Sequence, residues 1–183
     1  MNIIFHNQTK IKNTTQNNIR NYHFLRKKYL STKNFDTLFE IIKNNMLKIG
    51  FNIVDEDKNL WINNLKKELL NDNFYLYTIY YNGKICGFIE MIESNNQLII
   101  GEIQFSDIVK GSKLILHTIN FILNNKQFNK YDKAYFNINK NNIMSNKTFV
   151  HLGAKIILEK EKSFKYEILR SNVQQYTNFL TKK

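Results

Sequence analysis

The chain has 183 residues, a formal net charge of +12 and 43% hydrophobic residues. This length fits one domain with a real core, and the hydrophobic content excludes a wholly disordered chain. The only cysteine, Cys86, excludes an intramolecular disulfide and a cysteine-based metal site. Because no apolar run has the length of a membrane span and Met1–Phe5 is too short for a signal peptide, we expect a cytoplasmic protein without membrane contact.

The positive charge comes from 27 Lys and Arg residues set against 15 Asp and Glu residues. Such a balance permits phosphate-bearing ligands or nucleic acid as partners. The lysines are spread along the chain, however, and diffuse lysine is more typical of a solvated surface than of a nucleic-acid groove. Nucleic acid therefore stays an option that is not favoured.

The N-terminal part predicts one uncertain segment, one strand and two helices. Residues 1–21 are rich in Asn, Gln and Thr and form either an extra edge strand or a loose arm. Tyr22–Leu30 is predicted as a strand. Helical spacing of apolar residues then predicts a first helix that is capped by Thr32 or Asn34 and ends at Gly50. A second helix should start near Asp55–Asp57, with an apolar stripe made by Leu60, Trp61, Leu65 and Leu69.

The middle of the chain predicts three antiparallel strands. Phe74–Tyr81 is aromatic and β-branched, and the following Asn82-Gly83 is a strong signal for a type I′ hairpin turn. Lys84–Glu93 is the expected partner strand. Ser94–Asn96 then turns the chain into a third strand, Leu98–Phe105.

A basic, glycine-containing loop, Ser106–Ser112, leads from this third strand into a predicted helix over Leu114–Leu123. The first amides of a helix have no internal partner and attract anions, so strand, loop and helix together are suited to hold a phosphate. Lys110 and Lys113 add full charges there. The simpler interpretation is a strand-to-helix turn with solvated lysines.

The C-terminal part continues with a strand, a helix and a hairpin. Lys133–Asn139 is the predicted strand, and Asn141–Leu152 is a helix capped by Asn141 or Asn142. Ala154–Leu158 and Phe164–Leu169 pair around a charged turn. A last helix, 171–183, is expected to be capped by Ser171. No linker divides the chain, so residues 1–183 are predicted to form a single domain.

This order of elements resembles the GCN5-related N-acetyltransferase (GNAT) superfamily. Asn82–Ile89 is similar to the second hairpin of that family. Glu102–Phe105, followed by Lys110-Gly111, is similar to its fourth strand and pyrophosphate loop. Asn142-x-x-Ser145-x-x-x-Phe149-x-x-x-Gly153 has the spacing of another family motif. The resemblance covers about Tyr22 to Leu169.

The resemblance implies an α+β fold, with a mixed and mostly antiparallel sheet that is flanked by helices and splayed between its fourth and fifth strands. It also implies acetyl-CoA as cosubstrate, with its pantetheine arm along the exposed edge of the fourth strand. The acceptor would be a primary amine of a small molecule or peptide, and a homodimer is an option. The implied cofactor-binding residues are Ile103, Gln104, Phe105, Val109, Lys110, Gly111, Ser112, Lys113 and Asn142.

The chemistry implied by the resemblance is direct attack of a neutral amine on the thioester, which requires proximity and a general base. Glu102 is the first candidate base, acting through water; the alternative is a solvent-facing or salt-bridged strand residue. Glu90 and Glu93 are lesser candidates. No metal is implied. His151 lies on the helix that carries the expected acid, but about 200° from that position, so we predict an ordinary surface or core histidine.

Two positions depart from the family pattern. The loop lacks both signature glycines after its basic residue, and Lys113 stands there instead. Phe149 occupies the position of a tyrosine that often returns a proton to the thiolate, and it is predicted to pack in the core. Two alternatives to an acetyltransferase thus stay open: a degenerate protein that binds CoA without turnover, and an acetyltransferase associated with RNA or the ribosome.

Overall fold

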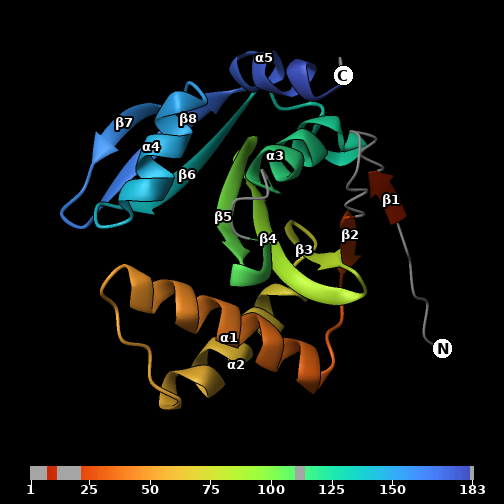
Figure 1. The fold of residues 1–183 in the computed structure, drawn as a ribbon, viewed down its shortest axis with the longest axis vertical. Helices are drawn as coiled ribbons and strands as arrows, with labels where there is room; N and C mark the ends of the chain where they lie inside the picture. Colours follow the sequence, from red (N-terminus) through yellow and green to blue (C-terminus); the bar gives the residue numbers. More distant parts are fainter. Residues whose placement is uncertain (1–7, 12–21, 110–113, 182–183) are drawn as a thin grey trace. The chain divides into compact units, whose positions relative to one another are not determined.

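The computed structural model describes residues 8–11, 22–109 and 114–181. The strands of this part of the chain are hydrogen-bonded in the order β1-β2-β3-β4-β5-β6-β8-β7 (Figure 1). The chain forms two compact units. The first comprises Met1–Met91 and Glu102–Val109, and the second comprises Ile92–Gly101 and Lys110–Lys183. Two strands, β4 (Lys84–Ser94) and β5 (Gln97–Phe105), contribute residues to both units.

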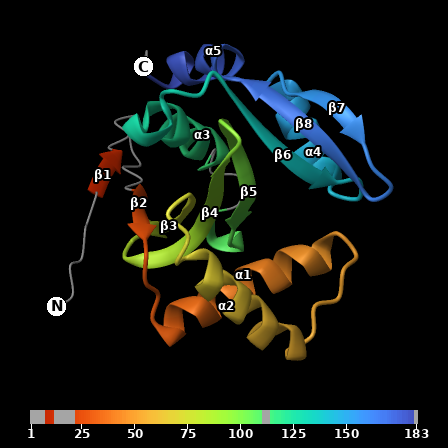
Figure 2. The same ribbon diagram turned by 180° about the vertical axis from the view of Figure 1, so that it is seen from behind.

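The first unit contains the N-terminal strands. β1 (Gln8–Ile11) pairs antiparallel with β2 (Tyr22–Lys27), which in turn pairs antiparallel with β3 (Phe74–Tyr81). Of the two options for the N-terminal segment, the extra edge strand is therefore found over Gln8–Ile11. Figure 2 shows β1 next to β2 from the opposite side.

Two helices complete the first unit, α1 (Thr32–Lys48) and α2 (Glu56–Glu68). The predicted N-caps of α1 are wrong by one residue or more, because the cap is Ser31, whose side chain accepts a hydrogen bond from the Asn34 amide. Gly50 ends the helix with φ of +87°, as predicted.

The two helices are held together by aromatic packing. The rings of Phe39 and Trp61 lie 5.8 Å apart between their centroids, and Leu65 and Leu69 are buried. The expectation that Leu60 belongs to the apolar stripe is wrong, since it is 64% exposed.

The predicted turns are confirmed by their backbone angles. Asn82 and Gly83 both have positive φ, 49° and 74°, which is the requirement of a type I′ hairpin turn. Asn95 and Asn96 have φ of 49° and 57° in the turn between β4 and β5.

The second unit joins parallel and antiparallel pairings. β5 pairs parallel with β6 (Lys133–Asn139). β6 pairs antiparallel with β8 (Ser163–Leu169), and β8 with β7 (Lys155–Glu159). The mixed and mostly antiparallel sheet confirms the predicted α+β class.

Three helices of the second unit are α3 (Leu114–Asn124), α4 (Ile143–His151) and α5 (Arg170–Thr181). α5 already begins at Arg170, so the prediction that Ser171 caps it is wrong. Side chains of α3, α4 and α5 line one apolar cavity together with Leu98 and Ile100 of β5 and Ala134 of β6. The core of this unit thus lies between the helices and one face of the strands. Short 3₁₀ turns cover Asp107–Val109 of the first unit and Lys126–Phe128 of the second.

Gly87 of β4 lies against the backbone of β5. A Cβ added at this residue would be 2.5 Å from the carbonyl oxygen of Gln104 and 2.8 Å from Cδ1 of Phe105. Only a glycine lets the two strands approach this closely.

We therefore expect Gly87→Ala to lower the free energy of unfolding by about 1–3 kcal/mol, because the methyl group must displace backbone atoms. Urea unfolding checks this value. Lys84→Ala, an exposed change on the same strand, is the control and should stay within about 0.5 kcal/mol of the wild type. An equal stability of all three proteins would contradict the close approach.

Candidate active site

The parallel pairing between β5 and β6 is short. Leu98, Ile99 and Ile100 pair with Ala134, Tyr135 and Phe136, and the ladder stops there, although β5 continues to Phe105 and β6 to Asn139. In the described part of the chain, no strand pairs with this edge of Glu102–Phe105. The paired residues of β5 belong to the second unit, whereas Glu102–Phe105 belong to the first.

Backbone groups of β5 alternate between the two edges of the strand. The Ser106 amide donates to the Cys86 carbonyl oxygen at 2.9 Å, and the Gln104 carbonyl faces Gly87. The backbone groups of residues 104 and 106 therefore point toward β4. Because successive residues of a strand point to opposite edges, Ile103 and Phe105 direct their amide and carbonyl groups away from β4. This edge can therefore pair with an extended ligand that carries amide groups.

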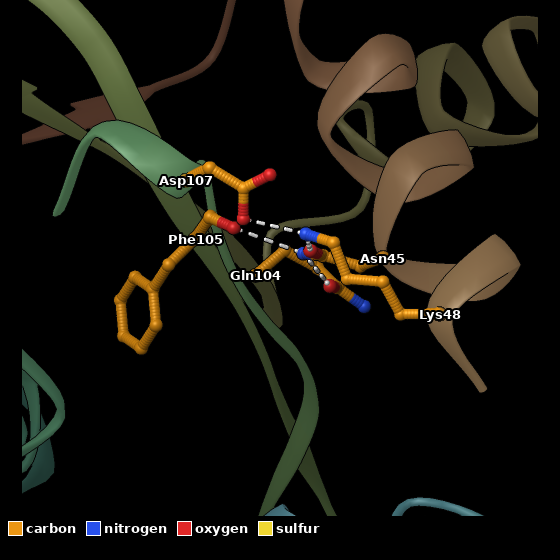
Figure 3. A network of polar contacts seen from close by, with 5 residues as sticks. All are labelled: Asn45, Lys48, Gln104, Phe105 and Asp107. Carbon is orange, nitrogen blue, oxygen red and sulfur yellow. Dashed lines mark hydrogen bonds and ion pairs between the residues drawn. The ribbon is translucent and has the colours of Figure 1, made fainter. Parts of the chain in front are cut away.

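The side chains of Glu102 and Gln104 lie on one face of β5, because they are two residues apart. Gln104 Nε2 donates to Glu102 Oε2 at 2.6 Å. Asn45, in the C-terminal half of α1, donates from Nδ2 to Gln104 Oε1 at 2.8 Å and to the Phe105 carbonyl oxygen at 3.0 Å (Figure 3). The helix thus fixes both the Gln104 amide and the last carbonyl of the strand.

Lys48 determines how the side-chain amides of Asn45 and Gln104 are oriented. Its ammonium group donates to Asn45 Oδ1 at 3.2 Å and forms an ion pair with Asp107 Oδ1 at 2.6 Å (Figure 3). An ammonium can only donate, so Asn45 must turn its oxygen to Lys48 and its NH₂ to Gln104. Gln104 consequently turns its own NH₂ to Glu102, where a carboxylate is the matching acceptor.

Two carboxyl groups with raised pKa values lie in this part of the first unit. Burial raises the pKa of Glu102, and the hydrogen bond from Gln104 partly offsets that rise. Burial, followed by the negative charges of Glu102 and Glu68, raises the pKa of Glu90 on β4 to about 8. At neutral pH Glu90 is therefore mainly protonated.

The predicted phosphate loop is described only in part. Val109 is buried, and its amide donates to the Ser106 carbonyl oxygen at 3.3 Å. The other predicted loop residues, Lys110, Gly111, Ser112 and Lys113, lie outside the described residues.

The remaining predicted residues belong to the second unit. Asn142 caps α4 by accepting a hydrogen bond from the Ser145 amide at 3.1 Å. Phe149 is buried, with its ring centroid 4.5 Å from that of Phe136, so the predicted core role is confirmed. His151 is exposed on the surface. Glu93 forms an ion pair with Lys130 at 3.3 Å.

Sequence reasoning did not find Asn45 and Lys48. Asparagine and lysine are abundant throughout this chain, so neither residue gives a local signal, and their contacts with Gln104 and Asp107 span 59 positions. No cluster of three or more metal-ligating side chains occurs among the described residues.

The comparisons with known proteins identify the fold. FdhC, a nucleotide-linked sugar GNAT, has a TM-score of 0.62 and 16% identity, over 86% of this chain and 94% of that one. PaiA N-acetyltransferase from Thermoplasma acidophilum, solved in complex with coenzyme A, has a TM-score of 0.60 and 16% identity, over 80% of this chain and 98% of that one. N-acetyltransferase PseH from Campylobacter jejuni has a TM-score of 0.60 and 12% identity, over 81% of this chain and 97% of that one.

This chain therefore has the GCN5-related N-acetyltransferase fold, as its sequence resemblance implied. No protein-family model matches the sequence. No curated protein matches it either. None of the described helices is long and apolar enough to span a bilayer.

The raised pKa of Glu90 makes stability depend on pH. Glu90 keeps its proton up to about pH 8 in the folded chain, against an ordinary value of 4.5. The folded state thus binds more protons than the unfolded state between these values, and the free energy of unfolding falls as the pH rises through this window. We expect Glu90→Gln to remove a fall on the order of 3–5 kcal/mol, which is what a pKa of about 8 against 4.5 implies.

Urea unfolding of wild type and Glu90→Gln at several pH values between the two pKa values checks this prediction. Glu161→Gln, at an exposed glutamate of the second unit, is the matched control and should follow the wild type. Parallel curves for wild type and Glu90→Gln would show that Glu90 titrates normally.

Proposed function

We propose that this protein transfers an acetyl group from acetyl-CoA to a primary amine of a small molecule or peptide by direct attack. The observation that carries the proposal is the edge of β5 beyond Ile100, where the ladder with β6 ends and a carboxyl group lies on the same strand. The fold supports it, because each of the three solved structures compared above is named an N-acetyltransferase or a GNAT.

The residues present fit a pantetheine arm. Ile103 and Phe105 direct backbone donors and acceptors to the open edge, and the Phe105 carbonyl keeps one lone pair beyond the one that Asn45 uses. By the family resemblance, Val109–Lys113 would bind the pyrophosphate and Asn142 would add an amide contact. Acetyl-CoA supplies the activated thioester when bound.

Glu102 is the proposed base. A primary amine attacks only after its ammonium form has lost a proton, and a carboxylate whose pKa is raised by burial holds that proton better than an exposed one. Gln104 limits the rotation of the carboxylate by binding Oε2, which leaves Oε1 for the amine or for an intervening water. Glu90, protonated beside it, adds no second charge that would compete for the proton.

One observation favours the alternative of a protein that binds CoA without turnover. Phe149 stands where the family tyrosine is expected, and it is packed against Phe136. The chain therefore lacks a hydroxyl at that position to protonate the leaving thiolate. Acetyl transfer then requires the thiolate to leave unprotonated or to take a proton from solvent.

Glu102→Gln should lower kcat for acetyl transfer about 10²- to 10⁴-fold, since glutamine cannot accept the proton. Thiol release from acetyl-CoA with a panel of primary amines measures the rate, and Glu40→Gln on the exposed face of α1 is the control. CoA should raise the melting temperature of both variants and of the wild type equally. Stabilisation by CoA without thiol release from any amine would instead support binding without turnover.

Because the Ile103 amide points away from β4 and the Gln104 amide faces it, proline should have different effects at these two adjacent positions of β5. Ile103→Pro removes an amide that points away from β4, so the fold should tolerate it while CoA binding weakens about threefold to tenfold. Gln104→Pro removes an amide that faces β4 and should lower the melting temperature clearly. Thermal unfolding with and without CoA measures both effects. Equal destabilisation by the two prolines would contradict the assignment of the edges.

A further inference from the structure

A hydrogen-bond network within the second unit joins the end of β6 to the start of α4. Asn146 of α4 donates from Nδ2 to the carbonyl oxygens of Asn139 at 2.9 Å and of Asn142 at 3.0 Å. Its Oδ1 accepts a hydrogen bond from the Tyr166 hydroxyl of β8 at 2.9 Å. The Asn146 side chain thus connects the last residue of β6, the N-cap of α4 and the middle of β8.

The Tyr166 hydroxyl holds the Asn146 amide in this orientation. The two backbone carbonyls can only accept hydrogen bonds, so the NH₂ group of Asn146 faces them and its oxygen faces Tyr166. Tyr166 is 1% exposed, and its ring is stacked on that of Phe136 with 5.5 Å between the centroids. Because this ring is packed on all sides, its hydroxyl is a fixed donor for the Asn146 oxygen.

Asn142, the N-cap of α4, is held by the same network. Its backbone carbonyl accepts from Asn146, and its backbone amide donates to the Asn139 carbonyl oxygen at 3.0 Å. Its side-chain Oδ1 accepts from the Ser145 amide at 3.1 Å. With the oxygen bound in this way, the NH₂ group of Asn142 is left as a donor, and no acceptor among the described residues bonds it.

We propose that Tyr166 is a positioning residue for the cosubstrate, because it orients Asn146 and, through Asn146, the N-cap Asn142. The inference rests on the proposed function, which gives Asn142 an amide contact with CoA. Without the Tyr166 hydroxyl, the Asn146 oxygen loses its donor and the side chain can turn away from the two carbonyls. The NH₂ group of Asn142 is then no longer held in one direction, so the cosubstrate binds more weakly while the role of Glu102 is unchanged.

Tyr166→Phe removes only the hydroxyl, and Tyr176→Phe is its matched control. The Tyr176 hydroxyl donates to the His151 carbonyl oxygen at 2.6 Å, at the other end of the same helix. We expect Tyr166→Phe to raise the Kd of CoA and the KM of acetyl-CoA about threefold to tenfold and to leave kcat unchanged. Tyr176→Phe should change neither constant, even where its melting temperature falls as far. Isothermal titration calorimetry and thiol-release kinetics measure these constants.

Asn142→Ser tests whether the effect passes through Asn142. Serine still caps the helix but has no NH₂ group, so this variant should weaken CoA binding about threefold to tenfold as well. In the double variant, Tyr166→Phe should then add nothing further. An unchanged Kd in Tyr166→Phe, a fully additive double variant, or equal weakening by Tyr176→Phe would overturn the inference and leave the proposed function standing. A wild type that does not bind CoA would overturn both.

Discussion

The end of the parallel ladder at Ile100 and Phe136 is the constraint on which the candidate site depends. A strand of an ordinary sheet has its amide and carbonyl groups paired on both edges. β5 keeps its pairing with β4 as far as Ser106, while its other edge lacks a partner strand after three residues. Unpaired backbone groups on a strand are costly unless water or a ligand satisfies them. In a fold shared with N-acetyltransferases, this edge is where we propose that an extended, amide-bearing cosubstrate pairs.

A network of hydrogen-bonded side chains runs from Asp107 through Lys48, Asn45 and Gln104 to Glu102. Lys48 is exposed, and its ion pair with Asp107 contributes little to stability. Its effect is orientation, because it determines which end of the Asn45 amide faces Gln104, and so which end of Gln104 faces Glu102. Through these contacts the last turns of α1 position the carboxylate of β5. Burial raises the pKa of that carboxyl group, and the hydrogen bond from Gln104 partly offsets the rise.

Much of the fold could be predicted from local patterns. The Asn82-Gly83 turn, the strand Lys133–Asn139 and the Asn142 cap depend on residues close in the sequence, and the structure has them as predicted. Errors occurred where tertiary packing decides, as for Leu60, and where several caps compete, as at Ser31. The candidate site was only half predictable. The strand Leu98–Phe105 was predicted from its apolar, β-branched run and Glu102 was proposed from the family resemblance, but Asn45 contacts Gln104 across 59 positions, which no local pattern encodes.

Amide hydrogen exchange of β5, resolved by residue, tests the central claim most directly. In the protein without CoA, the amides of Ile103 and Phe105 should exchange quickly, while the amide of Ser106, bonded to Cys86, should be protected. Addition of CoA should then slow exchange at Ile103 and Phe105 and leave Ser106 unchanged. Protection of Ile103 and Phe105 without CoA, or exchange there that CoA does not alter, would contradict an open edge that receives the cosubstrate.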